Sequence, residues 1–301
     1  MPYPLALRYL CALLVSATLL ATQALADSEP IRYTVTAPDG VSLAVQEAGN
    51  PDGPAIVFVH GLLGSRLNWN AQVNSAQLQR YRMITYDLRG HGLSGKPSGA
   101  EAYTEGSRWA DDLAAVLHAT QARRPVLVGW SLGGAVISNY LARHGDDDIA
   151  GAVYVNGVIE LSPEQIVAHP ELYRDLNSAD LQTHLETVRA FLKLCFDTQP
   201  DPDTFELLFA NAAMASWDMQ HAVQSMGIDA AKGLSNAGVP VLLLYGARDA
   251  LIHAEPAIAR AQQLNPHARS LLYAGSGHAP FLEESERFNR DLARFVDSAG
   301  K

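Results

Sequence analysis

The chain has 301 residues, of which 48% are hydrophobic and 18% are charged, and its formal net charge is −10. This composition is too apolar for a disordered chain, and the length suits one large folded domain or two small ones. Because an acidic surface repels phosphate backbones, we expect no nucleic-acid partner and favour a small neutral organic substrate.

The first 26 residues are typical of an export signal. Arg8 precedes a mostly apolar run over residues 10–20, and Ala24-Leu25-Ala26 places small residues at the two positions that a signal peptidase reads. We therefore predict a signal peptide over residues 1–26, cleavage before Asp27, and a periplasmic or secreted mature protein. The alternative is an uncleaved N-terminal anchor, but the run is shorter than the roughly 20 apolar residues of a membrane span. We expect no stable membrane insertion after cleavage.

Beyond residue 26, apolar strand-like runs alternate with helical patterns, which is typical of βαβ units. The predicted strands are Ile31–Thr36, Val41–Gln46, Ala55–Val59, Tyr81–Tyr86, Pro125–Val128, Ile149–Val155, Val239–Tyr245 and Ser270–Tyr273. Helical periodicity covers Arg108–Thr120, Leu132–Arg143 and Phe281–Val296. The first two strands should pair antiparallel around Asp39-Gly40. The sequence thus predicts an α/β fold with a mostly parallel central sheet flanked by helices.

The strand rhythm stops between about Val158 and Leu234, where only helical stretches occur. Amphipathic patterns cover Leu181–Phe196 and Thr204–Ala215, with Pro200-Asp201-Pro202 between them. The simplest organisation is one core domain with a helical insertion. Its predicted boundaries are 27–157 and 235–301 for the core domain and 158–234 for the insertion.

Gly129-Trp130-Ser131-Leu132-Gly133 matches the G-x-S-x-G nucleophile elbow and lies between a predicted strand and a predicted helix. Glycine stands two residues away from the serine on each side because other side chains would collide with the tight turn. The hydroxyl lies at a helix N-terminus, whose dipole favours developing negative charge. We predict Ser131 as the nucleophile.

A serine hydroxyl is a weak nucleophile and needs a base. His278 follows the last predicted strand, at the edge of the sheet where α/β proteins place their ligands. Asp249 follows the preceding strand in the same way and would hold the imidazole in the required tautomer. The order Ser131, Asp249, His278 is that of elbow-type hydrolases. After the strand that ends at Val155 no carboxylate is adjacent, so Glu160 is only a reserve candidate for the acid.

Two backbone N–H groups should stabilise the oxyanion that forms during acyl transfer. One belongs to Leu132, the residue after the nucleophile. The other belongs to Leu62, in the glycine-containing loop His60-Gly61-Leu62-Leu63-Gly64 that follows the strand Ala55–Val59. His60 is expected to brace this loop.

These motifs together resemble the α/β-hydrolase superfamily. The segments that carry the resemblance are His60-Gly61, Tyr86-Asp87-Leu88-Arg89-Gly90-His91-Gly92-Leu93-Ser94, the elbow, Gly246–Asp249 and Gly277-His278. They occur in family order and span about Ile31 to Val296. Within the superfamily the chain is most similar to small esterases that include the cofactor-free haloperoxidase and perhydrolase branch.

The resemblance implies roles for two further segments. The turn Asp87–Ser94 would brace the loops around the site, so Arg89 and His91 are interpreted as structural. The insertion would be a helical cap that closes over the site and shapes an apolar pocket. We expect Trp130, Leu63 and Trp217 to line that pocket.

The residues and the resemblance predict a serine hydrolase that cleaves a carboxylic ester of a small apolar molecule through an acyl-enzyme. We expect no metal, because neither a His-Glu-x-x-His motif nor a cysteine cluster occurs, and no cofactor, because the glycine pattern at 129–134 is explained by the elbow and no phosphate-cradling glycine-rich loop occurs. The same residues could serve a haloperoxidase or perhydrolase, a lactonase or a C–C bond hydrolase. The alternative of another class is a ligand-binding protein on a hydrolase scaffold, although a pure binder has no need of all three catalytic groups.

Overall fold

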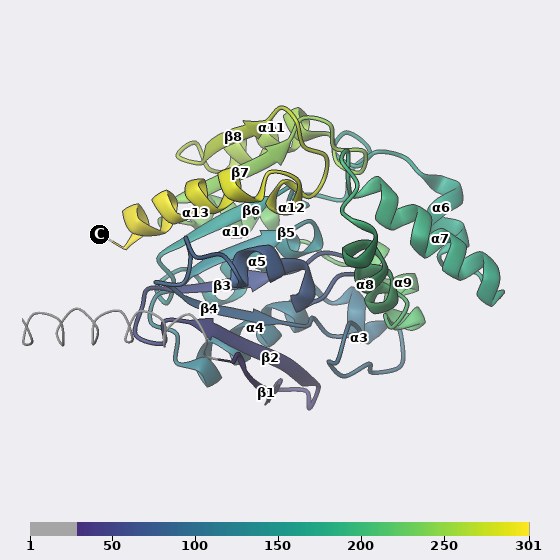
Figure 1. The fold of residues 1–301 in the computed structure, drawn as a ribbon, viewed down its shortest axis with the longest axis horizontal. Helices are drawn as coiled ribbons and strands as arrows, with labels where there is room; N and C mark the ends of the chain where they lie inside the picture. The colour runs from purple at the N-terminus through teal and green to yellow at the C-terminus, as the bar shows by residue number, and fades with distance from the viewer. Residues whose placement is uncertain (1–28, 301) are drawn as a thin grey trace, which may run out of the picture.

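The computed structural model describes residues 29–300, and the predicted signal peptide lies outside the described residues. These residues form a sheet of eight strands in the order β1-β2-β4-β3-β5-β6-β7-β8 (Figure 1). The strands are β1 (Ile31–Thr36), β2 (Ser42–Gly49), β3 (Ala55–Val59), β4 (Arg82–Tyr86), β5 (Val126–Trp130), β6 (Gly151–Val155), β7 (Val241–Gly246) and β8 (Arg269–Tyr273). β2 runs antiparallel to β1 and to β4, and the other neighbouring pairs are parallel. The prediction of a mostly parallel sheet with an antiparallel opening pair is confirmed.

The helices fall into two groups by their place in the chain: those that precede β6 or follow β7, and those in the connection from β6 to β7. The helices that precede β6 or follow β7 are η1 (Arg66–Trp69), α2 (Asn70–Val73), α3 (Glu101–Thr104), α4 (Gly106–Thr120), α5 (Leu132–His144), α11 (Ala254–Leu264), α12 (Pro280–Glu283) and α13 (Ser285–Ala299). α5 packs beside α4, whereas α13 packs with α2 and α12. α11 was not among the predicted elements.

The connection from β6 to β7, named the β6–β7 segment (residues 156–240), is helical. It holds α6 (Pro170–Asp175), α7 (Leu181–Leu194), α8 (Pro202–Ala212), α9 (Trp217–Ala222), η2 (Val223–Ser225) and α10 (Ala230–Asn236). Figure 1 shows α6, α7, α8 and α9 gathered beside one end of the sheet, and α10 packs against α5. Of the helices within residues 29–300, none is long and apolar enough to cross a membrane.

The start of α8 differs from the prediction, which placed Pro202 in a linker and began the helix at Thr204. Pro202 is instead the first helical residue, and the Asp201 side chain accepts a hydrogen bond from the Thr204 N–H at 3.0 Å. Proline suits the first helical position because its missing N–H would have no helical partner there. The two residues therefore begin the helix rather than precede it.

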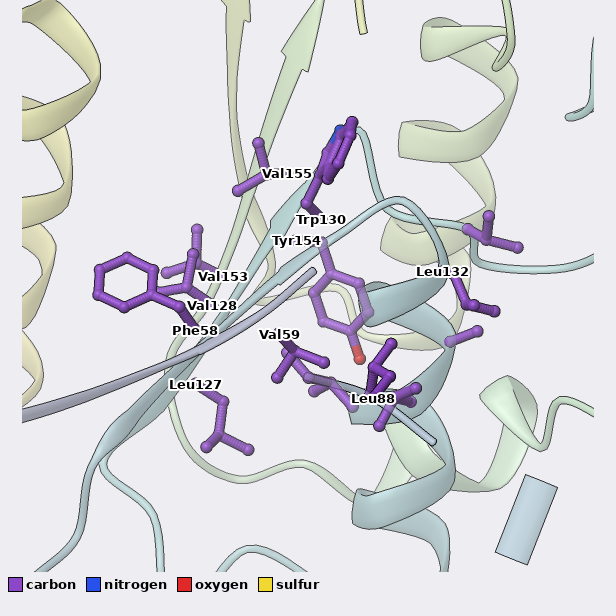
Figure 2. Packing of buried hydrophobic residues seen from close by; sticks show 14 of the residues in the cluster. Phe58, Val59, Leu88, Leu127, Val128, Trp130, Leu132, Val153, Tyr154 and Val155 are labelled. Atoms are coloured by element: carbon purple, nitrogen blue, oxygen red, sulfur yellow. The ribbon is translucent and has the colours of Figure 1, made fainter. Parts of the chain in front are cut away.

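The core explains why the central strands are continuous apolar runs. Every residue of β3, β5, β6 and β7 is buried, as expected for strands that are covered on both faces. Figure 2 shows this packing around β5, where Leu127 and Val128 point to opposite sides of the sheet. Packing on both faces fixes the strand that leads into the elbow.

The register of the parallel strands brings their C-terminal ends to one edge of the sheet. Val59 pairs with Gly129, Trp130 with Val155 and Gly246 with Tyr273. The loops that follow β3, β5, β6, β7 and β8 therefore leave the sheet together. These loops carry the predicted site residues.

Candidate active site

Ser131 occupies the sharp turn between β5 and α5. Its backbone has φ 53° and ψ −118°, a conformation that costs a residue with a side chain on the order of 1–3 kcal/mol. The Ser131 N–H donates to Val155 O at 3.0 Å, and its carbonyl accepts from the Gly134 and Val158 N–H groups, both at 2.9 Å. A Cβ at position 133 would lie 2.3 Å from Val59 O, so only glycine fits there. The turn has the local structure that the elbow motif predicts.

Asp249 and His278 come together in the loops after β7 and β8. His278 Nδ1 lies 2.7 Å from Asp249 Oδ2, and both side chains are only 1% exposed. The N–H groups of Leu251 and Ile252 donate to Asp249 Oδ1 at 2.7 and 3.1 Å. Because a carboxylate accepts hydrogen bonds, Nδ1 carries the imidazole proton in this pair and Nε2 is left as an acceptor. Nε2 is the atom that could take a proton from a hydroxyl.

Trp130 connects this pair to the elbow. Its indole Nε1 donates to the His278 carbonyl oxygen at 2.8 Å, and the two ring centroids are 5.6 Å apart. Trp130 thus links Ser131 to His278. In the described part of the chain, no hydrogen bond joins the Ser131 and His278 side chains directly. A base and a nucleophile often form their hydrogen bond only when substrate binds.

The loop after β3 passes close to Ser131. A Cβ at Gly61 would lie 2.8 Å from the Ser131 Cβ, so a residue with a side chain would push this loop away. Leu62, Ser131 and Leu132 all line one cavity. The two residues predicted to supply the oxyanion donors therefore line the same cavity as the predicted nucleophile.

That cavity has a volume of about 530 Å³, within the usual range for sites that bind small molecules. Most of it is apolar, and much of the lining comes from the β6–β7 segment. Its apolar lining includes Leu62, Leu132, Val158, Leu161, Ile166, Phe191, Val223, Met226, Ile228, Leu251 and Ile252. The polar groups on its wall, apart from Ser131, are Ser162, His169, Tyr173, Gln224 and His253. No Asp, Glu, Lys or Arg is among the described residues that line it.

The predicted pocket residues Trp130, Leu63 and Trp217 lie elsewhere, which corrects the prediction. Trp130 points away from Leu132 (Figure 2) and is buried against His278 and Phe281. Leu63 packs into the core, with φ 59° and 1% exposure, so its neighbour Leu62 reaches the cavity instead. Trp217 is 44% exposed at the start of α9 and packs on His184 of α7.

Asn156 contacts Asp249, the predicted acid, but was not among the predicted site residues. It follows β6 directly, is fully buried and has φ 42°. Its Nδ2 donates to Asp249 Oδ2 at 2.6 Å, and its Oδ1 accepts from the Gly246 N–H at 3.2 Å. The signal available in the sequence was a polar residue at the C-terminal end of the strand beside β7.

Glu160, the reserve candidate for the acid, is held by other partners. Arg260 Nε donates to its Oε1 at 2.9 Å, and Gln165 Nε2 lies 3.3 Å from its Oε2. Within the described part of the chain, no cluster of three or more His, Cys, Asp or Glu side chains could hold a metal ion.

Buried histidines fix the loops around the site. His60 Nε2 accepts from the Leu88 N–H at 2.9 Å, and its Nδ1 lies 2.8 Å from Gly61 O. Burial lowers the pKa of His60 to about 4, so the ring stays neutral and can accept that hydrogen bond. The ring therefore ties the loop after β3 to the loop after β4.

The turn after β4 is anchored in the same manner. Arg89 makes two hydrogen bonds of 2.7 Å to Asp112 on α4, and both side chains are buried. His91 Nδ1 lies 2.9 Å from Arg89 O, and burial lowers the pKa of His91 to about 3. These contacts agree with the interpretation of Arg89 and His91 as structural.

Comparison with known proteins places the chain in a family. The model of the alpha/beta hydrolase fold family matches residues 54–285. A bifunctional esterase/perhydrolase of Acinetobacter calcoaceticus is 28% identical over an alignment of 281 residues that covers 88% of this chain and 99% of the relative. A non-heme chloroperoxidase of Streptomyces lividans is 27% identical over 279 residues, covering 88% and 99% of the two chains.

Among solved structures, a protein of Burkholderia cenocepacia named provisionally as an aryl esterase is 71% identical. The match has a TM-score of 0.89 and covers 89% of this chain and 99% of that one. The expected resemblance to small esterases and cofactor-free haloperoxidases is confirmed.

Proposed function

Since the chain belongs to the alpha/beta hydrolase fold family, we propose that it is a serine esterase that hydrolyses neutral, apolar carboxylic esters. The observation that carries the proposal is the buried Asp249–His278 pair, which Trp130 joins to the elbow, together with the position of the elbow serine on the wall of an apolar cavity. The 71% identity to the Burkholderia protein favours aryl esters among the candidate substrates.

In the proposed mechanism, Ser131 Oγ attacks the ester carbonyl while His278 Nε2 takes its proton. The developing oxyanion accepts hydrogen bonds from the Leu62 and Leu132 N–H groups. The alcohol then leaves with the proton from His278, and an acyl group remains on Ser131. Water, deprotonated by His278, releases the acid and restores the serine. Asp249 holds the imidazole in the tautomer that both steps need.

The cavity predicts which esters react. We expect p-nitrophenyl acetate, butyrate and hexanoate to be hydrolysed with a higher kcat/KM than the palmitate, because a cavity of about 530 Å³ cannot enclose the longest chain. The measurement is the release of p-nitrophenol by the purified protein. A palmitate optimum would contradict this size limit.

A matched pair of substrates tests the charge of the cavity. The mono-p-nitrophenyl ester of succinic acid is close in size to the butyrate but adds a carboxylate, which no cationic side chain on the described lining can balance. An unpaired buried charge is costly, so we expect kcat/KM for the succinate to be at least about tenfold lower. Equal values would place the acyl group outside the cavity.

A second candidate function is perhydrolysis, which the Acinetobacter relative's name favours. Hydrogen peroxide would attack the acyl-enzyme in place of water, giving a peroxyacid, while the peroxide proton passes through His278 to Ser131. We expect peracetic acid to form from p-nitrophenyl acetate and peroxide, at a rate that depends on Ser131. If the wild type formed peracid no faster than Ser131→Ala does, perhydrolysis would be rejected and hydrolysis would remain the proposed activity.

A further inference from the structure

The carboxylate of Glu283, at the end of α12, accepts hydrogen bonds from four backbone N–H groups. Oε1 accepts from Gly277 at 2.9 Å and from Ala279 at 3.3 Å. Oε2 accepts from Asp197 at 2.9 Å and from Thr198 at 2.8 Å. One side chain thus joins two parts of the chain that are about 80 residues apart in sequence.

The two donors to Oε1 are the residues on either side of His278. Fixing both neighbouring N–H groups fixes the backbone that carries the imidazole. The Trp130 Nε1 bond to the His278 carbonyl, at 2.8 Å, holds the same residue from the elbow side. Glu283 and Trp130 therefore restrain the histidine backbone from two directions.

The two donors to Oε2 belong to the α7–α8 link (residues 195–201) in the β6–β7 segment. This link packs directly on the histidine loop, because a Cβ at Gly277 would lie 2.6 Å from the Asp197 N atom. The Asp197 side chain also pairs with Arg248 at 2.7 Å, and Arg248 immediately precedes Asp249. α7 carries Phe191, which lines the cavity.

We infer that Glu283 is a positioning residue that holds His278 in place and couples it to the α7–α8 link, an inference that rests on the proposed function. A carboxylate suits this task because each of its two oxygens can accept more than one hydrogen bond. A movement of the link would be transmitted through Glu283 to the backbone on both sides of His278. The packing of the β6–β7 segment therefore affects the chemical step as well as the shape of the cavity.

The test is Glu283→Gln. Its amide has one acceptor oxygen and one NH₂ group, so one of the two pairs of N–H groups must face a donor. We expect kcat for p-nitrophenyl butyrate to fall about 10- to 100-fold with KM changed less than about threefold, because small displacements of a catalytic group reduce the rate without removing substrate contacts. The low-field proton signal of His278 Nδ1–H should broaden or shift.

Glu284→Gln is the matched control. Glu284 is the adjacent carboxylate, but it accepts from the Ser276 hydroxyl at 2.7 Å and pairs with Arg287 at 3.1 Å, not with the backbone beside His278. We expect this variant to keep kcat within about twofold of the wild type. A twofold change in rate corresponds to less free energy than one hydrogen bond contributes. An equal loss in Glu284→Gln would overturn the inference, because it would reflect charge or local folding.

Glu283→Asp serves if the glutamine variant does not fold. It keeps the carboxylate but is one methylene shorter, so it cannot reach both pairs of N–H donors. We therefore expect kcat to fall again while KM stays nearly unchanged. A folded variant at position 283 with wild-type kcat, or with only KM changed, would overturn the inference. If the wild type shows no Ser131-dependent ester turnover, the proposed function fails and this inference with it. Ser131-dependent turnover that is unaffected by Glu283→Gln removes only the inference.

Discussion

Ser131→Ala should reduce kcat for p-nitrophenyl esters by about 10⁴- to 10⁶-fold, the range expected when the nucleophile of a coupled triad is removed. The variant lacks the hydroxyl that is proposed to form the acyl-enzyme, whereas the cavity and its Leu62 and Leu132 lining remain. KM or ligand affinity should therefore change little. Steady-state hydrolysis and fluorophosphonate labelling of the protein would both measure the loss, and labelling should vanish.

The strained backbone at position 131 supplies the control. Ser131→Gly should be as inactive as Ser131→Ala. Its free energy of unfolding in urea should exceed that of Ser131→Ala by about 1–3 kcal/mol, because glycine adopts φ 53° and ψ −118° without the steric penalty of a Cβ. Ester turnover within tenfold of the wild type in either variant would show that another group is the nucleophile. Equal stability of the two variants would contradict the strain.

Much of the fold could be predicted because its signals are local. β3, β5, β6 and β7 are buried on both faces, so each is a continuous apolar run that stands out in the sequence. The convergence of Ser131, Asp249 and His278 on one edge then follows from a general property of parallel strands, whose C-terminal ends lie together. The assignment of catalytic roles to these three residues stays a prediction until it is tested by activity.

The pocket could not be predicted in the same way, because its lining depends on packing between distant elements. Trp130 and Leu132 both flank Ser131, yet only Leu132 reaches the cavity, since the Trp130 indole is fixed by the His278 carbonyl. Trp217 looked suitable as a large aromatic in the insertion, but α9 packs it against His184 on α7. No periodicity in the sequence distinguishes these outcomes.

The supporting polar residues were missed for a related reason. Asn156 occupies a position where only a carboxylate was sought, although an amide there can hold the acid of the next strand. Glu283 lies in a helical pattern whose sequence gives no sign of bonds to Asp197 and Thr198. Hydrogen bonds between segments far apart in the chain become visible only when the strands and helices are placed in space.

Asp249→Asn should lower kcat by about 10⁴-fold with little change in KM, and the hydrogen bonds around this side chain explain why. The Leu251 and Ile252 N–H groups, at 2.7 and 3.1 Å from Oδ1, would select the amide oxygen for that position. The NH₂ group would then replace Oδ2, where it meets His278 Nδ1 and the Asn156 NH₂ group. His278 would have to accept at Nδ1 and carry its proton on Nε2, so it could no longer take a proton from Ser131.

Because the site is buried, the Asp249→Asn side chain cannot relieve these unfavourable contacts by turning or by binding water. The side chains at positions 249 and 278 are 1% exposed, so water cannot replace the lost acceptor, and reversing the amide would set its NH₂ group against two backbone donors. Asp297→Asn is the matched control: that carboxylate lies half exposed on α13, where it pairs with Arg80, and its loss should leave turnover unchanged. Turnover within tenfold of the wild type in Asp249→Asn would mean that His278 does not depend on this carboxylate for its tautomer.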